Sequence, residues 1–417
     1  MSPGVLYLDT ARLGRMAPGA RRVVRDFVGL AGEVGLPLYG EEFLRSGFSV
    51  LPRPLQSRFS ALSAWTGVAG LKSAFRDVVE TLHHPGIFLA HRSALLMRLA
   101  IQMLTGRCRR VLTTDFDWSA YGNLLDIARR ESQTEICGVP LRNSILREKA
   151  AVGEIVSRVA SAFVGQECDG LFLTAVTHDG IRFPVVELVR EIERQRPVRM
   201  LVVDGAQAFC QIPTAPIIEL ADFFIAGCHK WLSAFEPLGI AFTNPRVFGP
   251  STRRLPELLR HHGIDDPLLN FTQQLEGNTL DAYTETVNVA PLFACAGALK
   301  EALRGAISID HSFRQRLLNA NRVAETASEA GWKAVQPAIE FQSGILLLEP
   351  TSESVVQLSP LQLRTHFHNR RISLTAYENG CIRLSMPDRP FKANDLDLLP
   401  NAFLSAATAG ETALPVR

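Results

Sequence analysis

The segment between residues 200 and 231 constrains the fold most, because it holds two short apolar runs that each end in polar residues. Residues 201–203 are apolar throughout and stop at Asp204-Gly205, as is typical of a strand buried on both faces. Residues 223–225 repeat this pattern. In α/β sheets, ligands bind at the carboxyl ends of the strands. Four polar side chains are therefore expected at one edge of the sheet: Asp204, Gln207, His229 and Lys230.

The same pattern of strand, polar turn and helix occurs at least four times before residue 231. The predicted strands cover residues 87–90, 110–114, 170–176, 201–203 and 223–225, and helices are predicted at 92–105, 120–130 and 184–195. Such repetition predicts an α/β fold with a mostly parallel, doubly wound sheet.

The pattern changes towards the C-terminus, where helices and strands alternate as in a smaller α+β domain. We predict an N-terminal arm at 1–32 that joins this small domain, a large cofactor domain at 33–290 and the small domain at 291–417. Residues 33–57, rich in Gly and Pro, and residues 244–286 are predicted to be loops that shape a substrate pocket.

The composition of the chain limits the kinds of partner that we expect. The formal net charge is only +2, so neither nucleic acid nor a membrane surface is expected as a partner. The longest apolar run, 289–299, is too short to cross a bilayer, and the N-terminus does not resemble a signal peptide, which favours the cytoplasm. Seven cysteines without a Cys-x-x-Cys pair predict neither disulfides nor a metal site.

The polar residues at the strand ends suit one kind of chemistry. Burial lowers the pKa of a lysine, so that Lys230 could attack an aldehyde and form an imine. A carboxylate such as Asp204 could keep a pyridine nitrogen protonated and so make the ring accept electrons. A buried ion pair is the structural alternative for Lys230.

Other residues could complete a site for such a ring. Gln207 could donate to a phenolic oxygen, and Trp118, at a third strand end, offers a flat face for stacking. Arg92 and Ser93 begin a helix after a strand, where backbone N–H groups could bind phosphate. A plain serine cap is the alternative there.

These motifs resemble those of the class V aminotransferase family of pyridoxal-phosphate enzymes, which have fold type I and include cysteine desulfurases and isopenicillin N epimerase-like proteins. Residues 203–208 match the family's Asp-x-Ala-Gln motif, and residues 227–232 resemble its His-Lys-Trp signature. The likeness extends to residues 7–11, 115–119 and 285–289, and so covers most of the chain.

The resemblance implies pyridoxal 5'-phosphate as cofactor, with Lys230 as the catalytic residue that carries it. It implies that Asp204 contacts the pyridine nitrogen and that Arg383 grips the carboxylate of an amino acid or keto acid substrate. Thr286 would reach the phosphate of the neighbouring subunit, which implies a homodimer with shared active sites. The remaining cofactor contacts implied are Ser93, Arg92, Trp118, Thr177, Gln207 and His229.

Several positions depart from the family. Gly227 replaces a residue that usually helps to hold the phosphate, and Trp118 cannot exchange protons as the usual histidine does. The catalytic cysteine loop of the desulfurases is missing. We therefore expect an aminotransferase or a carbon–heteroatom lyase of the C–S type. A cysteine desulfurase-like or epimerase activity and a non-catalytic scaffold are the alternatives.

Overall fold

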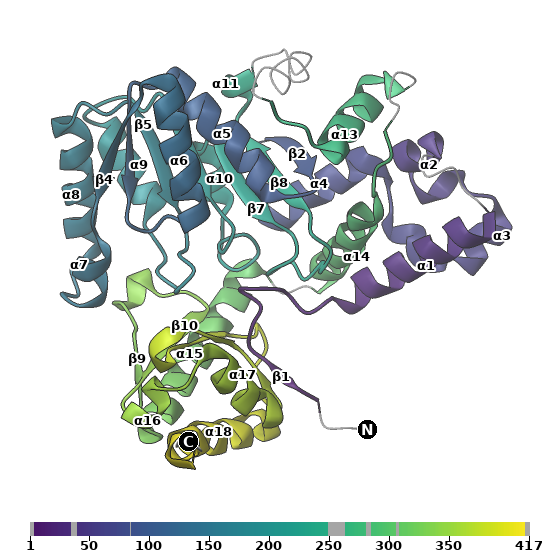
Figure 1. The fold of residues 1–417 in the computed structure, drawn as a ribbon. Helices are drawn as coiled ribbons and strands as arrows, with labels where there is room; N and C mark the ends of the chain where they lie inside the picture. The colour runs from purple at the N-terminus through teal and green to yellow at the C-terminus, as the bar shows by residue number, and fades with distance from the viewer. Residues whose placement is uncertain are drawn as a thin grey trace.

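The larger part of the protein is built on a seven-stranded sheet (Figure 1). The structure is a computed structural model that describes residues 4–34, 40–83, 85–248, 263–280, 285–305 and 308–412. The strand order is β2-β8-β7-β6-β5-β3-β4, in which β8 is antiparallel to both neighbours and the other pairs are parallel. The strands are β2 (Gly86–Ala90), β3 (Arg110–Thr114), β4 (Glu135–Val139), β5 (Gly170–Thr174), β6 (Met200–Asp204), β7 (Phe223–Gly227) and β8 (Gly239–Thr243).

The apolar strands are buried on both faces, as their composition predicts. In β6, Leu201 and Val203 belong to one core cluster, whereas Met200 and Val202 belong to the other. One face packs against α5 (Ser93–Arg107) and α6 (Ser119–Ser132). The other packs against α4 (Gly67–Val79), α8 (Val152–Gly165), α9 (Val185–Glu193) and α10 (Ala215–Leu220). The predicted α/β class with a mostly parallel, doubly wound sheet is therefore confirmed.

The C-terminal part forms a smaller antiparallel sheet in the order β12-β13-β10-β9, below the large sheet in Figure 1. Its strands are β9 (Trp332–Ala334), β10 (Ile345–Pro350), β12 (Thr375–Ala376) and β13 (Ile382–Ser385). The helices of this part are α15 (Ile309–Glu329), α16 (Glu353–Val356), α17 (Pro360–Asn369) and α18 (Ala393–Thr412). The N-terminal strand β1 (Leu6–Tyr7) pairs in parallel with β11 (Ile372–Ser373) of this part.

The N-terminal arm contacts both parts of the molecule. Its helix α1 (Pro18–Val34) packs against α14 (Ala290–Arg304), where Phe293 stacks on Phe27 at 4.0 Å between ring centroids. Phe293 belongs to the core cluster of the large sheet, although the predicted boundary at 290/291 assigns α14 to the small domain. The limits of the domains stay a prediction.

The segments predicted as loops contain helices, so that prediction is wrong in part. Residues 33–57 include α2 (Glu41–Ser46) and α3 (Arg53–Arg58), and residues 244–286 include α11 (Pro245–Phe248) and α13 (Pro267–Gly277). Proline favours the first turn of a helix as well as a loop, and α13 starts in this way, with the Asp266 side chain as its cap. A further short helix, α7 (Arg142–Leu146), follows β4.

None of the helices in the described part of the chain combines the length and the apolar composition that a transmembrane span requires.

Candidate active site

Asp204 lies at the carboxyl end of β6, between the ends of β5 and β7. Strand register aligns Asp204 with Thr174 on β5 and with Ile225 on β7. The carboxylate is buried, and its Oδ1 accepts a hydrogen bond of 2.9 Å from the Ala206 backbone N–H. Burial raises the pKa of Asp204, while the Ala206 N–H and the positive charge of Lys230 oppose this. A buried carboxylate with few donors favours a cation beside it.

The backbone around Lys230 is held by the N-terminal arm. The Gly14 N–H donates to the His229 carbonyl at 2.6 Å, and the Ser233 N–H donates to the Lys230 carbonyl at 2.9 Å. A Cβ atom on Gly14 would lie 1.9 Å from the Lys230 carbonyl oxygen, so only glycine fits at this position. The loop after β7 is therefore fixed by a segment more than two hundred residues away in sequence.

The Lys230 ammonium lies near one negative and one positive charge, those of Asp204 and Arg383. Burial lowers its pKa most, the Asp204 carboxylate raises it, and the Arg383 guanidinium lowers it again. The net direction is downwards, which favours the neutral and nucleophilic amine. The charges of Asp204 and Arg383 thus both act on Lys230, and the shared role of these residues in one site stays a prediction.

Two histidines each present a buried ring nitrogen that lacks a hydrogen-bonding partner in the described part of the chain. These atoms are Nδ1 of His229 and Nδ1 of His178. Burial, together with Lys230, lowers the pKa of His229 to about 4, and burial also lowers the pKa of His178. Both rings are therefore neutral at neutral pH. Buried polar atoms are nearly always paired, so these two mark places where a ligand could bind.

The Gln207 carboxamide is engaged by the protein itself. Its Nε2 donates to the Ala11 carbonyl at 2.8 Å, and its Oε1 accepts from Trp231 Nε1 at 2.9 Å. One N–H hydrogen of the amide remains for a ligand. The contact of Gln207 with a cofactor oxygen stays a prediction, and the structure adds that this side chain ties the arm to the Lys230 loop.

Ser93 is the first residue of α5, directly after the sharp turn that follows β2. The residue at the N-cap position is Arg92, and its side chain makes no capping hydrogen bond to the helix. The Gly239 backbone packs closely here, since a Cβ on Gly239 would lie 2.3 Å from the Ser93 nitrogen. Tyr121 forms a side-chain hydrogen bond with Ser93, while Arg92 is exposed. The positive end of α5 is thus available to an anion.

Trp118 and Thr177 differ in how much of each side chain is available to a ligand. Trp118 is 49% exposed, and its ring meets the His178 ring edge-on at 5.5 Å between centroids, so that a planar group could stack on it. The Thr177 hydroxyl donates to Asp179 Oδ1 at 2.5 Å and accepts from the Ile181 N–H at 2.8 Å. These bonds close a turn and leave Thr177 little capacity for a ligand.

Arg383 extends from β13 of the small sheet towards the large one. Its Nη1 donates to the His178 carbonyl at 3.2 Å, and its Nη2 donates to the Thr375 hydroxyl at 3.1 Å. Nη2 also lies 3.6 Å from Asp9 Oδ1, and Nε is buried without a partner in the described part. Arg383 therefore links the two sheets and retains a donor for a carboxylate.

Thr286 is exposed. In the residues described, it shares no hydrogen bond or charge interaction with the other predicted site residues. Its role towards a neighbouring subunit stays a prediction.

No protein-family model matches the sequence, and no curated protein matches it either. Solved structures do match the fold over nearly the whole chain. The apo cysteine desulfurase from Thermococcus onnurineus NA1 aligns with a TM-score of 0.69 at 12% identity, covering 97% of this chain and 95% of that one. The fold is that of the cysteine desulfurases.

Two further structures with this fold belong to enzymes with other activities. The cystine C–S lyase C-DES, in complex with its product cysteine persulfide, aligns with a TM-score of 0.68 at 12% identity, covering 96% of this chain and 97% of the other. The ureidoglycine-glyoxylate aminotransferase from Bacillus subtilis aligns with a TM-score of 0.66 at 11% identity, covering 100% of this chain and 96% of the other. The desulfurase fold is therefore shared by a lyase and an aminotransferase.

Sequence reasoning missed two polar residues near the site, Asp9 and Asp117. Asp9 contacts Arg383 as described, and Asp117 lies near Asp204. The Asp117 carboxylate accepts from the Thr113 hydroxyl at 2.6 Å. Asp117 follows the predicted strand 110–114 within three residues, so the rule that led to Asp204 could have found it.

Asp117 is expected to make stability depend on pH. Burial, and then the nearby Asp204 charge, raise its pKa to about 7, against 3.8 for the free side chain. The folded state thus holds this proton more tightly than the unfolded state, so the contribution is complete below about pH 4 and is lost as pH rises through 7. A difference of this size corresponds to roughly 4 kcal/mol, an upper bound.

We therefore predict that Asp117→Asn flattens the fall in the free energy of unfolding between pH 5 and about pH 8. Urea titrations of the cofactor-free protein at several pH values measure this. Asp115→Asn is the matched control, since Asp115 instead accepts backbone N–H bonds from Leu141 and Arg142. An unchanged pH slope in Asp117→Asn would contradict the assignment.

Proposed function

We propose that this protein is a pyridoxal 5'-phosphate-dependent enzyme that acts on an amino acid or keto acid, with Lys230 as the residue that binds the cofactor covalently. The observation that carries the proposal is the buried Lys230 amine with a lowered pKa beside the buried Asp204 carboxylate, at the ends of neighbouring strands. A structure with the same fold that supports it is a C-DES mutant with glycine covalently linked to the PLP cofactor.

The described residues fit this cofactor. Asp204 would face the pyridine nitrogen, and Trp118 would stack on the ring. Ser93 and the start of α5 would hold the phosphate, together with the unpartnered His229 ring. The absence of a side chain at Gly227 leaves room for that ring, because a Cβ there would lie 2.7 Å from a His229 ring carbon.

Different residues of the site would have different roles in the reaction. The bound cofactor supplies an electron-accepting ring that stabilises negative charge at the substrate α-carbon. Arg383 holds the substrate carboxylate and so orients the bond that breaks. Lys230, as a neutral amine, takes the α-proton and returns it, which a lysine with a lowered pKa can do at neutral pH. Trp118 cannot accept a proton and only covers the site.

Within this class we favour an aminotransferase or a C–S type lyase over a cysteine desulfurase. A desulfurase that carries sulfur on its own cysteine needs an accessible thiolate. Five of the seven free cysteines are buried, and burial raises the pKa of Cys210 to about 12. Burial also raises the pKa of the remaining thiol, Cys381. These thiols are poor nucleophiles, so a reaction that needs only the lysine and the ring fits better.

We also propose a cytoplasmic homodimer in which Thr286 of one chain completes the phosphate site of the other. The support is the resemblance of residues 285–289 to the corresponding family segment and the exposure of Thr286. The seven free cysteines suit a reducing compartment. The net charge of +2 supports a small-molecule partner over nucleic acid or membrane.

Covalent labelling tests the cofactor proposal. The purified protein is incubated with pyridoxal 5'-phosphate, reduced with borohydride and digested, and the modified peptide is identified by mass spectrometry. We expect one modified lysine, Lys230, together with a visible absorption band before reduction. Lys72 is the internal control, because it is also a buried lysine but is paired with Glu276 at 2.7 Å. Labelling spread over surface lysines, or none at all, would refute the proposal.

A further inference from the structure

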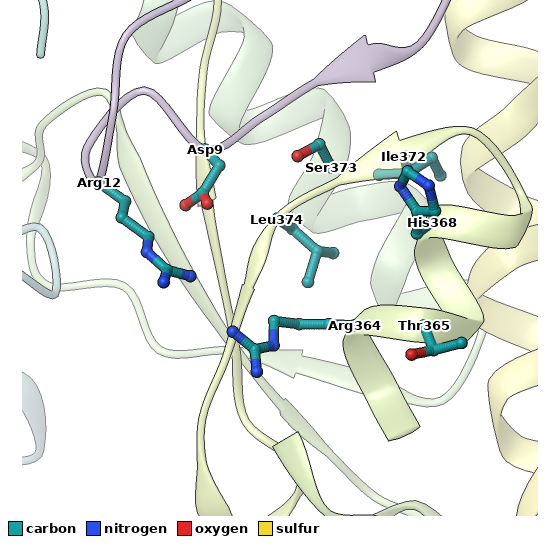
Figure 2. Close-up of a pocket in the computed structure, with 8 residues that line it drawn as sticks. All are labelled: Asp9, Arg12, Arg364, Thr365, His368, Ile372, Ser373 and Leu374. Atoms are coloured by element: carbon teal, nitrogen blue, oxygen red, sulfur yellow. The ribbon is translucent and has the colours of Figure 1, made fainter. Parts of the chain in front are cut away.

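A polar pocket lies between the N-terminal arm and the α17–β11 segment of the C-terminal part, outside the residues assigned to the cofactor. It has a volume of about 300 Å³. Asp9 and Arg12 of the arm form one side, and Arg364 and His368 of α17 form the other, with Ser373 from β11 between them (Figure 2). The pocket is thus built from two segments that are distant in sequence, 9–12 and 364–374.

The pocket carries uncompensated positive charge. In Figure 2 the guanidinium groups of Arg12 and Arg364 extend towards one another from opposite walls. Arg364 uses only its Nε, which donates to the Pro360 carbonyl at 3.2 Å. Among the described residues, neither Arg12 nor the two terminal nitrogens of Arg364 have an acidic partner.

Asp9 does not neutralise Arg12 or Arg364, because its carboxylate already compensates the positive charge of Arg383. Its side chain is largely buried, with 11% of its surface exposed. Its Oδ1 accepts a hydrogen bond from the Thr375 hydroxyl and lies 3.6 Å from Arg383 Nη2. The Asp9 carboxylate therefore compensates Arg383, and the charge of Arg12 and Arg364 remains for a ligand.

The donors suit one chemical group. Two guanidinium groups can each form paired hydrogen bonds to a tetrahedral oxyanion, and such bonds are roughly twice as strong as neutral ones. The hydroxyls of Ser373 and Thr365 and the His368 ring also line the pocket and add donors for further oxygens. An apolar or cationic ligand would leave the two arginines facing one another without compensation.

We propose that this pocket binds a phosphate group, held between Arg12 and Arg364, at a site separate from the one that contains Lys230. The phosphate could be inorganic or part of a small phosphate monoester. The inference goes beyond the proposed function, since it does not depend on what reaction Lys230 performs.

Isothermal titration calorimetry with the full-length protein tests the site. The protein is first loaded with pyridoxal 5'-phosphate, so that the helix α5 site is filled, and unbound cofactor, which is itself a phosphate monoester, is removed by gel filtration. Inorganic phosphate and glycerol 3-phosphate are then titrated separately. We expect one saturable site whose affinity falls about tenfold or more in Arg12→Gln and in Arg364→Gln. Tighter binding of the monoester identifies an organic phosphate as the ligand class, and equal affinities identify inorganic phosphate.

Arg15→Gln is the matched control, because Arg15 is exposed on the same arm but does not line the pocket. It should bind as the parent protein does. Arg364→Lys keeps the charge but loses the paired geometry, so its affinity should lie between those of the parent and Arg364→Gln. Circular dichroism verifies that each variant folds. Absence of saturable binding in the parent protein, or affinities in both Gln variants equal to that of Arg15→Gln, would overturn the proposal.

Discussion

Replacing Lys230 by alanine is expected to lower kcat with the preferred amino acid by at least about 10³-fold. The substitution removes the covalent attachment of the cofactor and also the amine that moves the α-proton, and the described site offers no equivalent group. His178 and His229 lie close by, but neither can form the imine, and burial lowers the pKa of both. Steady-state turnover of the cofactor-saturated variant measures the loss.

Lys72→Ala separates this effect from a general loss of a buried lysine. Lys72 is 6% exposed, burial lowers its pKa as it does for Lys230, and it pairs with Glu276 away from the strand ends. Its removal leaves Glu276 unpaired and should cost stability, yet kcat of the folded variant should stay within tenfold of the parent value. Retention of more than a tenth of the parent kcat in Lys230→Ala would exclude Lys230 as the catalytic residue.

The parts of the site that the sequence could predict depend on local pattern. An apolar run followed by a polar turn is sufficient to place Asp204, His229 and Lys230 at strand ends, because both faces of β6 and β7 are buried. The predicted α/β fold follows from repetition of the same pattern. The neighbouring solved structures, at 11–13% identity, agree with that fold.

The partners of these side chains could not be predicted, since they depend on contacts between distant segments. Gln207 bonds to Ala11, 196 positions away, and so serves the arm as well as the site. Arg383 is compensated by Asp9, which no local pattern connects to β13. The apolar composition of α14 indicates a buried helix but does not specify which core buries it.

Replacing Asp204 by asparagine is expected to lower kcat by about 10²–10³-fold with little change in KM. Asn keeps the size and one acceptor but not the negative charge, so a protonated ring nitrogen beside it would lose its compensation in a buried setting. Asp204 accepts a hydrogen bond from the Ala206 N–H and interacts electrostatically with Lys230. Among the described residues it has no hydrogen bond or ion pair with Arg383, the residue proposed to bind substrate. The loss should therefore appear in kcat.

Asp117→Asn is the matched control, because it removes the second buried carboxyl group near Asp204 while leaving Asp204 itself in place. Its kcat should remain within tenfold of the parent value. A readout independent of turnover is the pKa of Lys230, measured from the pH dependence of borohydride labelling. Asp204 raises that pKa, so Asp204→Asn should shift it downwards. Unchanged kcat and unchanged labelling in Asp204→Asn would show that Asp204 and Lys230 do not act together. The proposed role of the Asp204 carboxylate at the ring nitrogen would then be wrong.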